Sequence, residues 1–473
     1  MGELRRSAPR KRGSPSRVRG FAFVNVLGAV AASAIVAMPL SATDPDPEQV
    51  TFAGDVAIII QENCQNCHRP GGIGPMSLTS YDEVRPWAEV IKQRVVTREM
   101  PPYHYDTGVG IQALQNDWRM SEEEIRTIAA WVDAGAPMGD PALLPPPPNF
   151  PDGSEFRLID TFGRPPDVVV RSTPYDVPAI GSDRWWRPIV PSGITESRCI
   201  AGIETKPSLA ARSVSHHANT SFRGGFLPGP DGTPVEADER GGQLSEYAMG
   251  KIGEIVPSDA CRRAPANGEI SFDIHYYPNG EAVDDAVVEV GIWFLPEGEE
   301  PKYSQDLTLY GTQSGSGDLE IPPHGTLMTE GMTVWDHPVR IDSWQPHGHL
   351  RLVGAKLEVL DPTTGRKELL SMVSNWNAGW HHSHVYQPDV APLIPAGHIL
   401  VRTQWYDNTE ANVYMQKLGG SPDVWVGTGD RTADEMSHQW IAVTHLDEEG
   451  YQKLLAERKA KAASSSEAQA GSN

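Results

Sequence analysis

One stretch of the chain has the residue types and spacing needed to attach a cofactor covalently. Cys64 and Cys67 are separated by two residues, and His68 follows directly. Cys-X-X-Cys-His is the attachment signature of a c-type haem, in which the thiols add to the two vinyl groups and the imidazole ligates the iron. The alternative is a redox-active or zinc-binding cysteine pair, but no second pair stands nearby to complete a zinc site.

A second ligand for the haem iron is expected downstream. Met100 precedes two prolines in a loop, and a thioether is a good sixth ligand that raises the haem potential. Met76 is too close to His68 in the sequence to reach the other side of the haem. His104 is the alternative ligand and would lower the potential.

Histidines between about residues 165 and 445 form three groups. His216 and His217 are adjacent, His275 lies in an apolar stretch typical of a strand, and His347 and His349 are separated by one residue. Residues two apart in a strand share a face, so the last pair can hold one ion. Adjacent residues face opposite sides and share an ion only at a twist or bulge, or by using different ring nitrogens. Such imidazole groups suit copper or zinc, although any one of them alone is more often structural.

The order of these groups, followed by Asp434-Glu435-Met436, resembles the copper type II ascorbate-dependent monooxygenases, the family of peptidylglycine α-hydroxylating and dopamine β-monooxygenases. Connecting stretches at 320–323 and 397–408 match as well. The resemblance implies two copper ions in two β-sandwich (jelly-roll) domains. The first copper would be held by His216, His217 and His275, and the second, catalytic copper by His347, His349 and Met436. The thioether of Met436 is a soft ligand that favours Cu(I) over zinc.

This resemblance also implies a reaction. The His-His-Met copper binds O2 and removes hydrogen from a C–H bond of a small organic substrate, giving an alcohol. The other copper relays an electron across a solvent-filled gap between domains. The haem suggests that electrons come from the chain's own cytochrome, fed by a periplasmic donor, in place of ascorbate. The alternatives are a non-catalytic copper-binding or electron-transfer cytochrome, and a scaffold that has lost one copper site.

The chain departs from the family at several positions. Gln345 stands where the peptide-processing relatives carry an arginine that clamps the substrate carboxylate, so a C-terminal glycine peptide is not expected as substrate. Ser437 replaces a cysteine, and Trp440 follows the ligand methionine. We expect a more apolar pocket. The remaining histidines are expected to be structural or solvated. They include His438 and, by default, His381, His382 and His384, which could alternatively line the interdomain cleft or bind an additional ion.

The elements that position these residues follow from sequence periodicity. Residues 43–140 resemble a class I cytochrome c domain, with helices before the first cysteine, at about 81–96, and from a Ser121–Glu124 capping box to Gly135. The resemblance implies a small all-α domain with covalent haem c.

The remainder of the chain predicts a linker and two β domains. A Pro-rich linker covers 141–165, and alternating short strands predict two antiparallel sandwiches at 166–312 and 313–446. A short helix and a disordered tail are expected at 447–473.

Composition restricts the partners and the compartment. The formal net charge of −22 argues against nucleic acid. Residues 1–42 combine a basic lead with an apolar run, which predicts a signal peptide or an uncleaved membrane anchor and an exported, periplasmic protein. Cys199 and Cys261 are expected to form a disulfide in an oxidising compartment, with two buried free thiols as the alternative.

Overall fold

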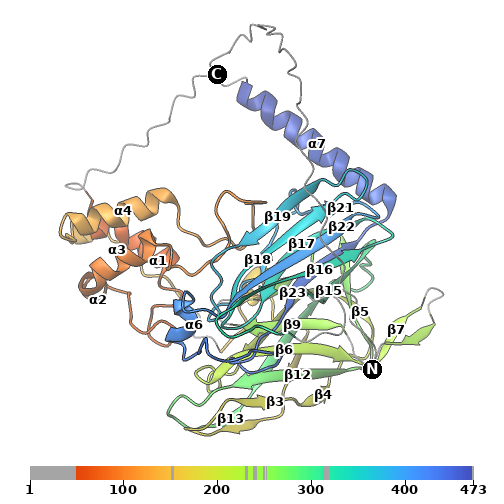
Figure 1. Cartoon of the computed structure of the whole chain (residues 1–473), viewed down its shortest axis with the longest axis horizontal. Helices are drawn as coiled ribbons and strands as arrows, with labels where there is room; N and C mark the ends of the chain where they lie inside the picture. Colours follow the sequence, from red (N-terminus) through yellow and green to blue (C-terminus); the bar gives the residue numbers. More distant parts are fainter. Residues whose placement is uncertain are drawn as a thin grey trace, which may run out of the picture. The chain divides into compact units, whose positions relative to one another are not determined.

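A computed structural model describes residues 50–150, 154–229, 233–237, 242–248, 251, 253–312 and 319–470, with side chains described up to Ser464. The predicted signal peptide or anchor at 1–42 lies outside these ranges. Within them, no helix is long and apolar enough to cross a membrane. The described residues form a mostly β protein with antiparallel, sandwich-like sheets and a few helices near the N-terminal end (Figure 1).

The N-terminal helices match the predicted periodicity with one interruption. They are a π-helical turn (Phe52–Val56), α1 (Ala57–Asn63), α2 (Tyr81–Val84), a 3-10 turn (Arg85–Trp87), α3 (Ala88–Val96) and α4 (Glu122–Asp133). Pro86 splits the helix predicted at 81–96, because proline has no N–H to donate and disfavours the helical conformation before it. The capping box between Ser121 and Glu124 is present at the start of α4.

The helices enclose a core of their own, but the loop between α3 and α4 packs elsewhere. Their core runs from Val50 to Ala136 and includes Trp131, which is fully buried. Tyr103 and Leu114, in contrast, belong to the core of the C-terminal strands. Part of the range predicted as the cytochrome domain is therefore built into the β structure.

Two large sheets carry the histidine groups. The ten-stranded sheet has the order β1-β14-β5-β11-β15-β23-β17-β20, with β10 beside β5 and β21 beside β17. Its strands are β1 (Val168–Arg171), β5 (Arg198–Pro207), β10 (Glu254–Ile255), β11 (Ala260–Ala264), β14 (Val288–Phe294), β15 (Tyr303–Gly311), β17 (Val339–His347), β20 (His384–Val385), β21 (Leu393–Ile394) and β23 (His438–His445). The five-stranded sheet contains β3 (Arg184–Trp186), β4 (Ile189–Pro191), β6 (Ser215–Arg223), β9 (Gln243–Ala248) and β12 (Glu269–Tyr276).

Smaller sheets complete the β structure. The four-stranded sheet contains β16 (Thr326–Val334), β18 (Leu352–Leu360), β19 (Lys367–Val373) and β22 (Ile399–Asp407). Two-stranded sheets pair β2 (Tyr175–Val177) with β13 (Val283–Ala286), and β7 (Phe226–Pro228) with β8 (Pro234–Glu236). The ten-stranded sheet joins the two predicted β domains, since β15 pairs in parallel with β11 and antiparallel with β23.

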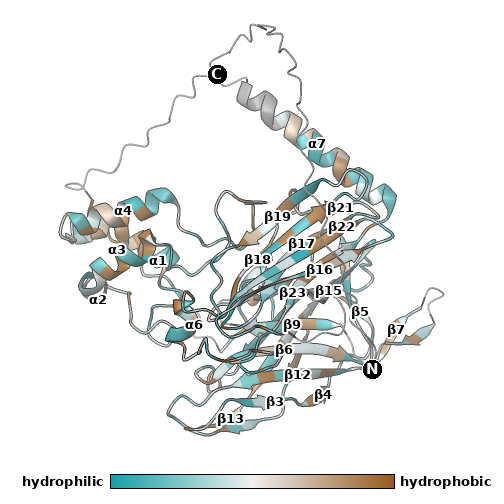
Figure 2. Ribbon diagram, viewed as in Figure 1, coloured by the Kyte–Doolittle hydropathy of each residue, from teal (hydrophilic) through white to brown (hydrophobic). Residues whose placement is uncertain are grey.

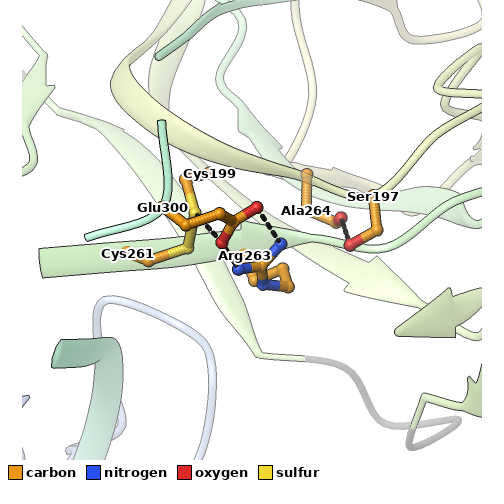
Figure 3. The surroundings of a disulfide bond; sticks show 6 residues. All are labelled: Ser197, Cys199, Cys261, Arg263, Ala264 and Glu300. Carbon is orange, nitrogen blue, oxygen red and sulfur yellow. Dashed lines mark hydrogen bonds and ion pairs between the residues drawn. A yellow bond between two sulfur atoms is a disulfide. The ribbon is translucent and has the colours of Figure 1, made fainter. Parts of the chain in front are cut away.

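A disulfide holds two neighbouring strands of the ten-stranded sheet. Cys199 on β5 and Cys261 on β11 are bonded, with Cα atoms 5.0 Å apart (Figure 3). The expected disulfide is therefore present in the structure. Arg263 pairs with Glu300 beside it.

The end of the predicted linker also packs on this sheet. Phe162 in α5 (Ile159–Phe162) stacks on Trp293 with ring centres 5.4 Å apart. The ordered chain therefore reaches the sheet before the predicted linker ends.

The C-terminal helix is longer than expected. α7 spans Glu448–Ala470, whereas the sequence predicted a short helix followed by a disordered tail at 447–473. Its last part is rich in alanine, which has the highest helix propensity, and this outweighs the small polar residues there. Figure 2 shows hydrophilic and hydrophobic residues mixed along its described part. One further short helix, α6, spans Val413–Lys417.

Candidate metal centres

The first histidine group forms a compact triad at a β-bulge. In the pairing of β6 with β12, His217 lies opposite His275, while Ser215 lies opposite Tyr276, so His216 is the extra residue of the bulge. A bulge turns adjacent side chains toward the same side, which is the condition predicted for His216 and His217 to share an ion. One ring nitrogen from each of the three histidines lies within 4.8 Å of the other two.

The spacing and hydrogen bonds of this triad fit a bound metal. The ring centres of His216, His217 and His275 are 5.1–5.2 Å apart. Imidazoles whose nitrogens lie about 2.0 Å from one ion, arranged tetrahedrally, have ring centres about 5 Å apart. His275 uses Nε2 to contact the Asp183 carboxylate at 3.0 Å, and its buried Nδ1 has no hydrogen-bond partner. A carboxylate on one ring nitrogen with the other left open is the usual setting of a metal-binding histidine.

Burial keeps these imidazoles neutral, as metal ligation requires. Desolvation and the neighbouring histidines lower the pKa of His216 to about 3 and hold that of His217 well below its usual value. The pKa of His275 is also lowered, mainly by burial. Neutral imidazoles present lone pairs to a cation at neutral pH.

The second predicted group also converges, although not as two strand residues. His347 is the last residue of β17, and His349 lies beyond the strand, so the prediction that both project from one strand is wrong. Their ring centres are 5.5 Å apart. The Nε2 of His347 lies 3.3 Å from the Sδ of Met436, close to the ~3.5 Å expected for two ligands of one tetrahedral ion.

A buried carboxyl group, Glu435, fixes the two loops that carry these ligands. It accepts hydrogen bonds from the backbone N–H groups of His349 (2.7 Å), Arg351 (2.7 Å) and Met436 (3.1 Å). Its side chain is fully buried, and desolvation raises its pKa. His349 also directs Nδ1 to the carbonyl of Asp434 at 3.1 Å, which leaves Nε2 for a metal.

Both predicted centres open onto one cavity of about 330 Å³. His217 of the triad and His347, His349 and Met436 of the second group lie in its wall. The other lining residues are Trp185, Asn219, Ser221, Gln243, Ser271, Asp273, Leu309, Asp430, His438 and Trp440. Polar and apolar side chains both line this cavity, and the expectation of a pocket more apolar than that of the relatives stays a prediction.

Ion pairs connect the two predicted β domains at this cavity. Arg187, which follows β3, pairs with Asp273 at 2.7 Å and with Asp430 at 2.8 Å. Asp273 lies on β12, in the first predicted β domain. Asp430 lies in the loop before Met436, in the second.

Two histidines expected to be structural lie beside the second group. His438 stacks on His347 with ring centres 4.6 Å apart, and burial lowers its pKa to about 3. His381 lies 4.8 Å from His347 and 6.1 Å from His217 by ring centres, so it stands between the two predicted centres. Its Nδ1 lies 3.6 Å from the buried carboxylate of Glu246. The local sequence signal was the His-His-X-His spacing, but its proximity to the other groups depends on the fold.

The Glu246 carboxylate is held in its charged form. Burial opposes its ionisation, but the adjacent His381 and Lys251 and a hydrogen bond from Gln345 lower its pKa to about 2. Gln345 is therefore occupied with Glu246, and it is absent from the cavity wall.

The remaining pair of the His-His-X-His stretch contacts the loop between α3 and α4. His382 packs against Tyr103 (5.5 Å), His104 (5.6 Å) and Trp118 (5.0 Å) by ring centres. The Nδ1 of His384 lies 3.3 Å from the Tyr103 hydroxyl. His104, the alternative haem ligand, is therefore stacked against the β structure.

Backbone hydrogen bonds fix this loop. The N–H of Gln115 donates to Val385 O at 2.7 Å, and that of Ile111 donates to Leu370 O at 2.8 Å. The segment that follows Met100 is thus attached to the strands that carry His384.

The haem motif has features that fit covalent attachment. Cys64 and Cys67 are both free thiols, and burial raises the pKa of Cys64 to about 12. The Nδ1 of His68 lies 3.3 Å from the carbonyl of Met76, so Nε2 remains for iron. A Cβ at Gly74 would lie 2.5 Å from the His68 ring, so glycine there allows the chain to pass close to the imidazole.

Met100 does not line the same cavity as the attachment residues. It is 36% exposed and lines a small cavity with Val95, Met120 and Ile125 among others. Neither the cysteines nor His68 line that cavity. The assignment of Met100 as sixth ligand stays a prediction.

Comparisons with known proteins add little to this geometry. No family model and no curated protein matches the chain. The major capsid protein P2 of bacteriophage PM2 is 9% identical, with a TM-score of 0.27 over 59% of this chain and 97% of that protein. The peptide N-glycanase F (PNGase F) is 8% identical, with a TM-score of 0.24 over 59% and 96%. Superpositions this poor carry no argument, so the candidate centres stand on their own residues.

Proposed function

We propose that the chain is an exported, haem c-containing copper monooxygenase that hydroxylates a C–H bond of a small organic substrate with O2. In this proposal the N-terminal helices are a cytochrome c domain, and the sandwich-like sheets are the two jelly-roll domains of a copper monooxygenase. The observation that carries it is one cavity lined by His217 of the first predicted ligand set and by all three residues of the second. Each set also has one buried imidazole nitrogen without a hydrogen-bond partner, Nδ1 of His275 and Nδ1 of His347.

The donor sets suit two copper ions with different tasks. His216, His217 and His275 provide three neutral imidazoles, and such a set binds copper in either oxidation state. His347, His349 and Met436 add a soft sulfur that favours Cu(I), the state that reacts with O2. Copper bound there supplies one-electron redox chemistry and O2 activation.

The chain's own residues orient these ligands and the substrate. Asp183 and the Asp434 carbonyl fix the rings of His275 and His349, and Glu435 fixes the backbone beside Met436. The polar wall formed by Asn219, Ser221, Gln243 and Ser271 favours a neutral substrate with hydrogen-bonding groups.

Contacts between the haem segment and the copper cavity favour internal electron supply. Tyr103 and His104 lie shortly after Met100 and pack on His382, whose neighbour His381 lies 4.8 Å from His347 by ring centres. Packed side chains of this kind connect the loop between α3 and α4 to the cavity wall, which supports the proposed route. The disulfide Cys199–Cys261 is consistent with export to an oxidising compartment.

Copper loading and oxygen uptake test this function. The haem-loaded full chain should bind at least two copper ions per haem and consume O2 with a reductant and a suitable small organic substrate. Copper binding without O2 consumption under any reductant would favour a non-catalytic copper-binding electron carrier. Less than one copper ion per haem would contradict the proposal.

A further inference from the structure

We propose that Glu246, His347 and His381 bind an additional divalent metal ion, distinct from the two predicted copper ions. This inference rests on the proposed function, because the new ion would share His347 with the His347–His349–Met436 centre. It adds a third cation to the same buried region.

Three separate elements bring these ligands together. Glu246 comes from β9, His347 from the end of β17, and His381 from the loop before β20. One ligand atom from each lies within 4.8 Å of the other two, and all three side chains are buried. Ligands about 2.0–2.1 Å from one tetrahedral ion are about 3.4 Å apart, so closing around an ion requires shifts of roughly 1 Å.

The unpartnered atoms lie where such an ion needs them. His347 and His381 are each only 5% exposed, and the Nδ1 of each is buried without a hydrogen-bond partner. Because Nε2 of His347 faces Met436, its Nδ1 is the atom left for a second ion. With both ions bound, His347 would bridge them as an imidazolate, and its remaining ring proton would be released to solvent. Buried polar groups without partners are uncommon in native proteins, and a bound cation would satisfy both nitrogens.

The carboxylate completes the set. Its Oε2 accepts a hydrogen bond from Gln345 and lies 3.8 Å from the Lys251 ammonium, while Oε1 lies 3.6 Å from Nδ1 of His381. Lys251 is closer to Glu254, at 2.9 Å. Among the described residues, Oε1 therefore pairs with no lysine or arginine.

The ligand types define the class of metal. Two imidazoles and one carboxylate are hard to intermediate donors without sulfur, which suits Cu²⁺, Zn²⁺ or Fe²⁺ rather than Cu(I). The simpler alternative is an ion pair between His381 and Glu246 that holds no metal. The two differ in metal content, which makes them separable.

Metal content of the haem-loaded full chain tests the proposal. We expect three Cu²⁺ ions per haem by mass spectrometry of the desalted protein, and two in both Glu246→Gln and His381→Asn. His382→Asn is the matched control, because His382 is the equally buried neighbour of His381 and lies outside the ligand set. The control should keep all three ions. The haem spectrum and circular dichroism check that each variant is folded.

Other outcomes separate this inference from the proposed function. Two ions in the wild type and two in Glu246→Gln would leave the proposed function standing and reduce Glu246–His381 to an ion pair. If Glu246→Gln loses one ion while His275→Ala and Met436→Ile lose none, the additional site stands and the two predicted copper centres fail. Electron paramagnetic resonance of the Cu²⁺ protein should also lose one signal component in both Glu246→Gln and His381→Asn.

Discussion

The proposed second copper centre would depend on a carboxyl group that is not itself a ligand. Glu435 accepts hydrogen bonds from three backbone N–H groups, two of which belong to His349 and Met436. The exchange Glu435→Gln places an NH2 group against donors that need an acceptor. We expect copper affinity of this centre to fall by roughly 10–100-fold, as is typical when the groups that orient metal ligands are removed.

Copper titration followed by Cu(I) chelator competition measures this loss. Exposed Glu449→Gln is the matched control and should leave the affinity unchanged. The haem spectrum should be that of the wild type in both variants. Unchanged copper affinity in Glu435→Gln would show that the backbone hydrogen bonds do not hold the ligands.

We expect the sulfur of Met436 to affect turnover as a metal ligand, and not only through the space that the side chain fills. Met436→Ile keeps an apolar side chain and removes the soft ligand 3.3 Å from His347. We expect turnover to fall at least 100-fold, while the haem and the three-histidine copper remain. Met332→Ile, at a 59% exposed position on β16, is the control. Retained turnover in Met436→Ile would exclude Met436 as a ligand.

At this scale the sequence indicated histidines that lie together in the fold, but it missed other histidines beside them. Residue order alone brought out His216, His217 and His275, and the fold places them within 4.8 Å. His381 and His438 were assigned to structural roles, because their proximity to His347 arises from strands and loops far apart in the chain. Long-range placement of this kind is not visible in local spacing.

At the scale of elements, a β-bulge and a disulfide constrain the strands of the first predicted β domain. The bulge at His216 was predicted as the condition for two adjacent histidines to share an ion. The prediction that His349 lies in the strand is wrong, because β17 ends two residues earlier, at His347. Helix caps were predictable from local residues such as Ser121, whereas the break at Pro86 shows that one residue overrides helical periodicity.

The disulfide gives a stability prediction. Cys199 and Cys261 are 62 residues apart, and a cross-link over a loop of that length stabilises the folded state by about 4 kcal/mol in the chain-entropy model. We expect the double exchange of both cysteines for alanine to lower the free energy of unfolding by about that amount. Denaturant unfolding followed by tryptophan fluorescence measures it. An unchanged midpoint would mean that the bond does not constrain the unfolded chain.

At the scale of the whole molecule, the two predicted β domains are not separate. β15, predicted to belong to the first, pairs with β23 of the second, and Tyr103 of the helical segment lies in the C-terminal core. Composition and periodicity identified the fold class but not these shared sheets, since strand pairing across distant segments leaves no local pattern.

Buried neutral histidines make the metal-free protein sensitive to acid. The pKa values of His104 (about 4), His216, His382 and His438 (about 3 each) are lowered in the folded state, chiefly by burial. The unfolded chain therefore takes up protons first, and stability falls as pH drops below about 6.5, by up to ~1.4 kcal/mol per pH unit for each histidine.

Thermal unfolding of the metal-free protein at pH 7.5, 6.0 and 5.0 tests this loss of stability toward acid pH. We expect the melting temperature to decrease steadily over this range, before most carboxylates titrate. A melting temperature that is constant or rises toward pH 5.0 would mean that these histidines are already protonated in the fold.

The central claim is that the haem supplies electrons to copper at the cavity. Stopped-flow spectroscopy of the reduced, copper-loaded protein mixed with O2 tests it most directly, with the haem absorbance as readout. We predict fast haem oxidation in the copper-loaded wild type and at least tenfold slower oxidation in the copper-free protein and in Met436→Ile. Haem oxidation at the same rate in all three samples, or a haem that stays reduced in the copper-loaded protein, would contradict it.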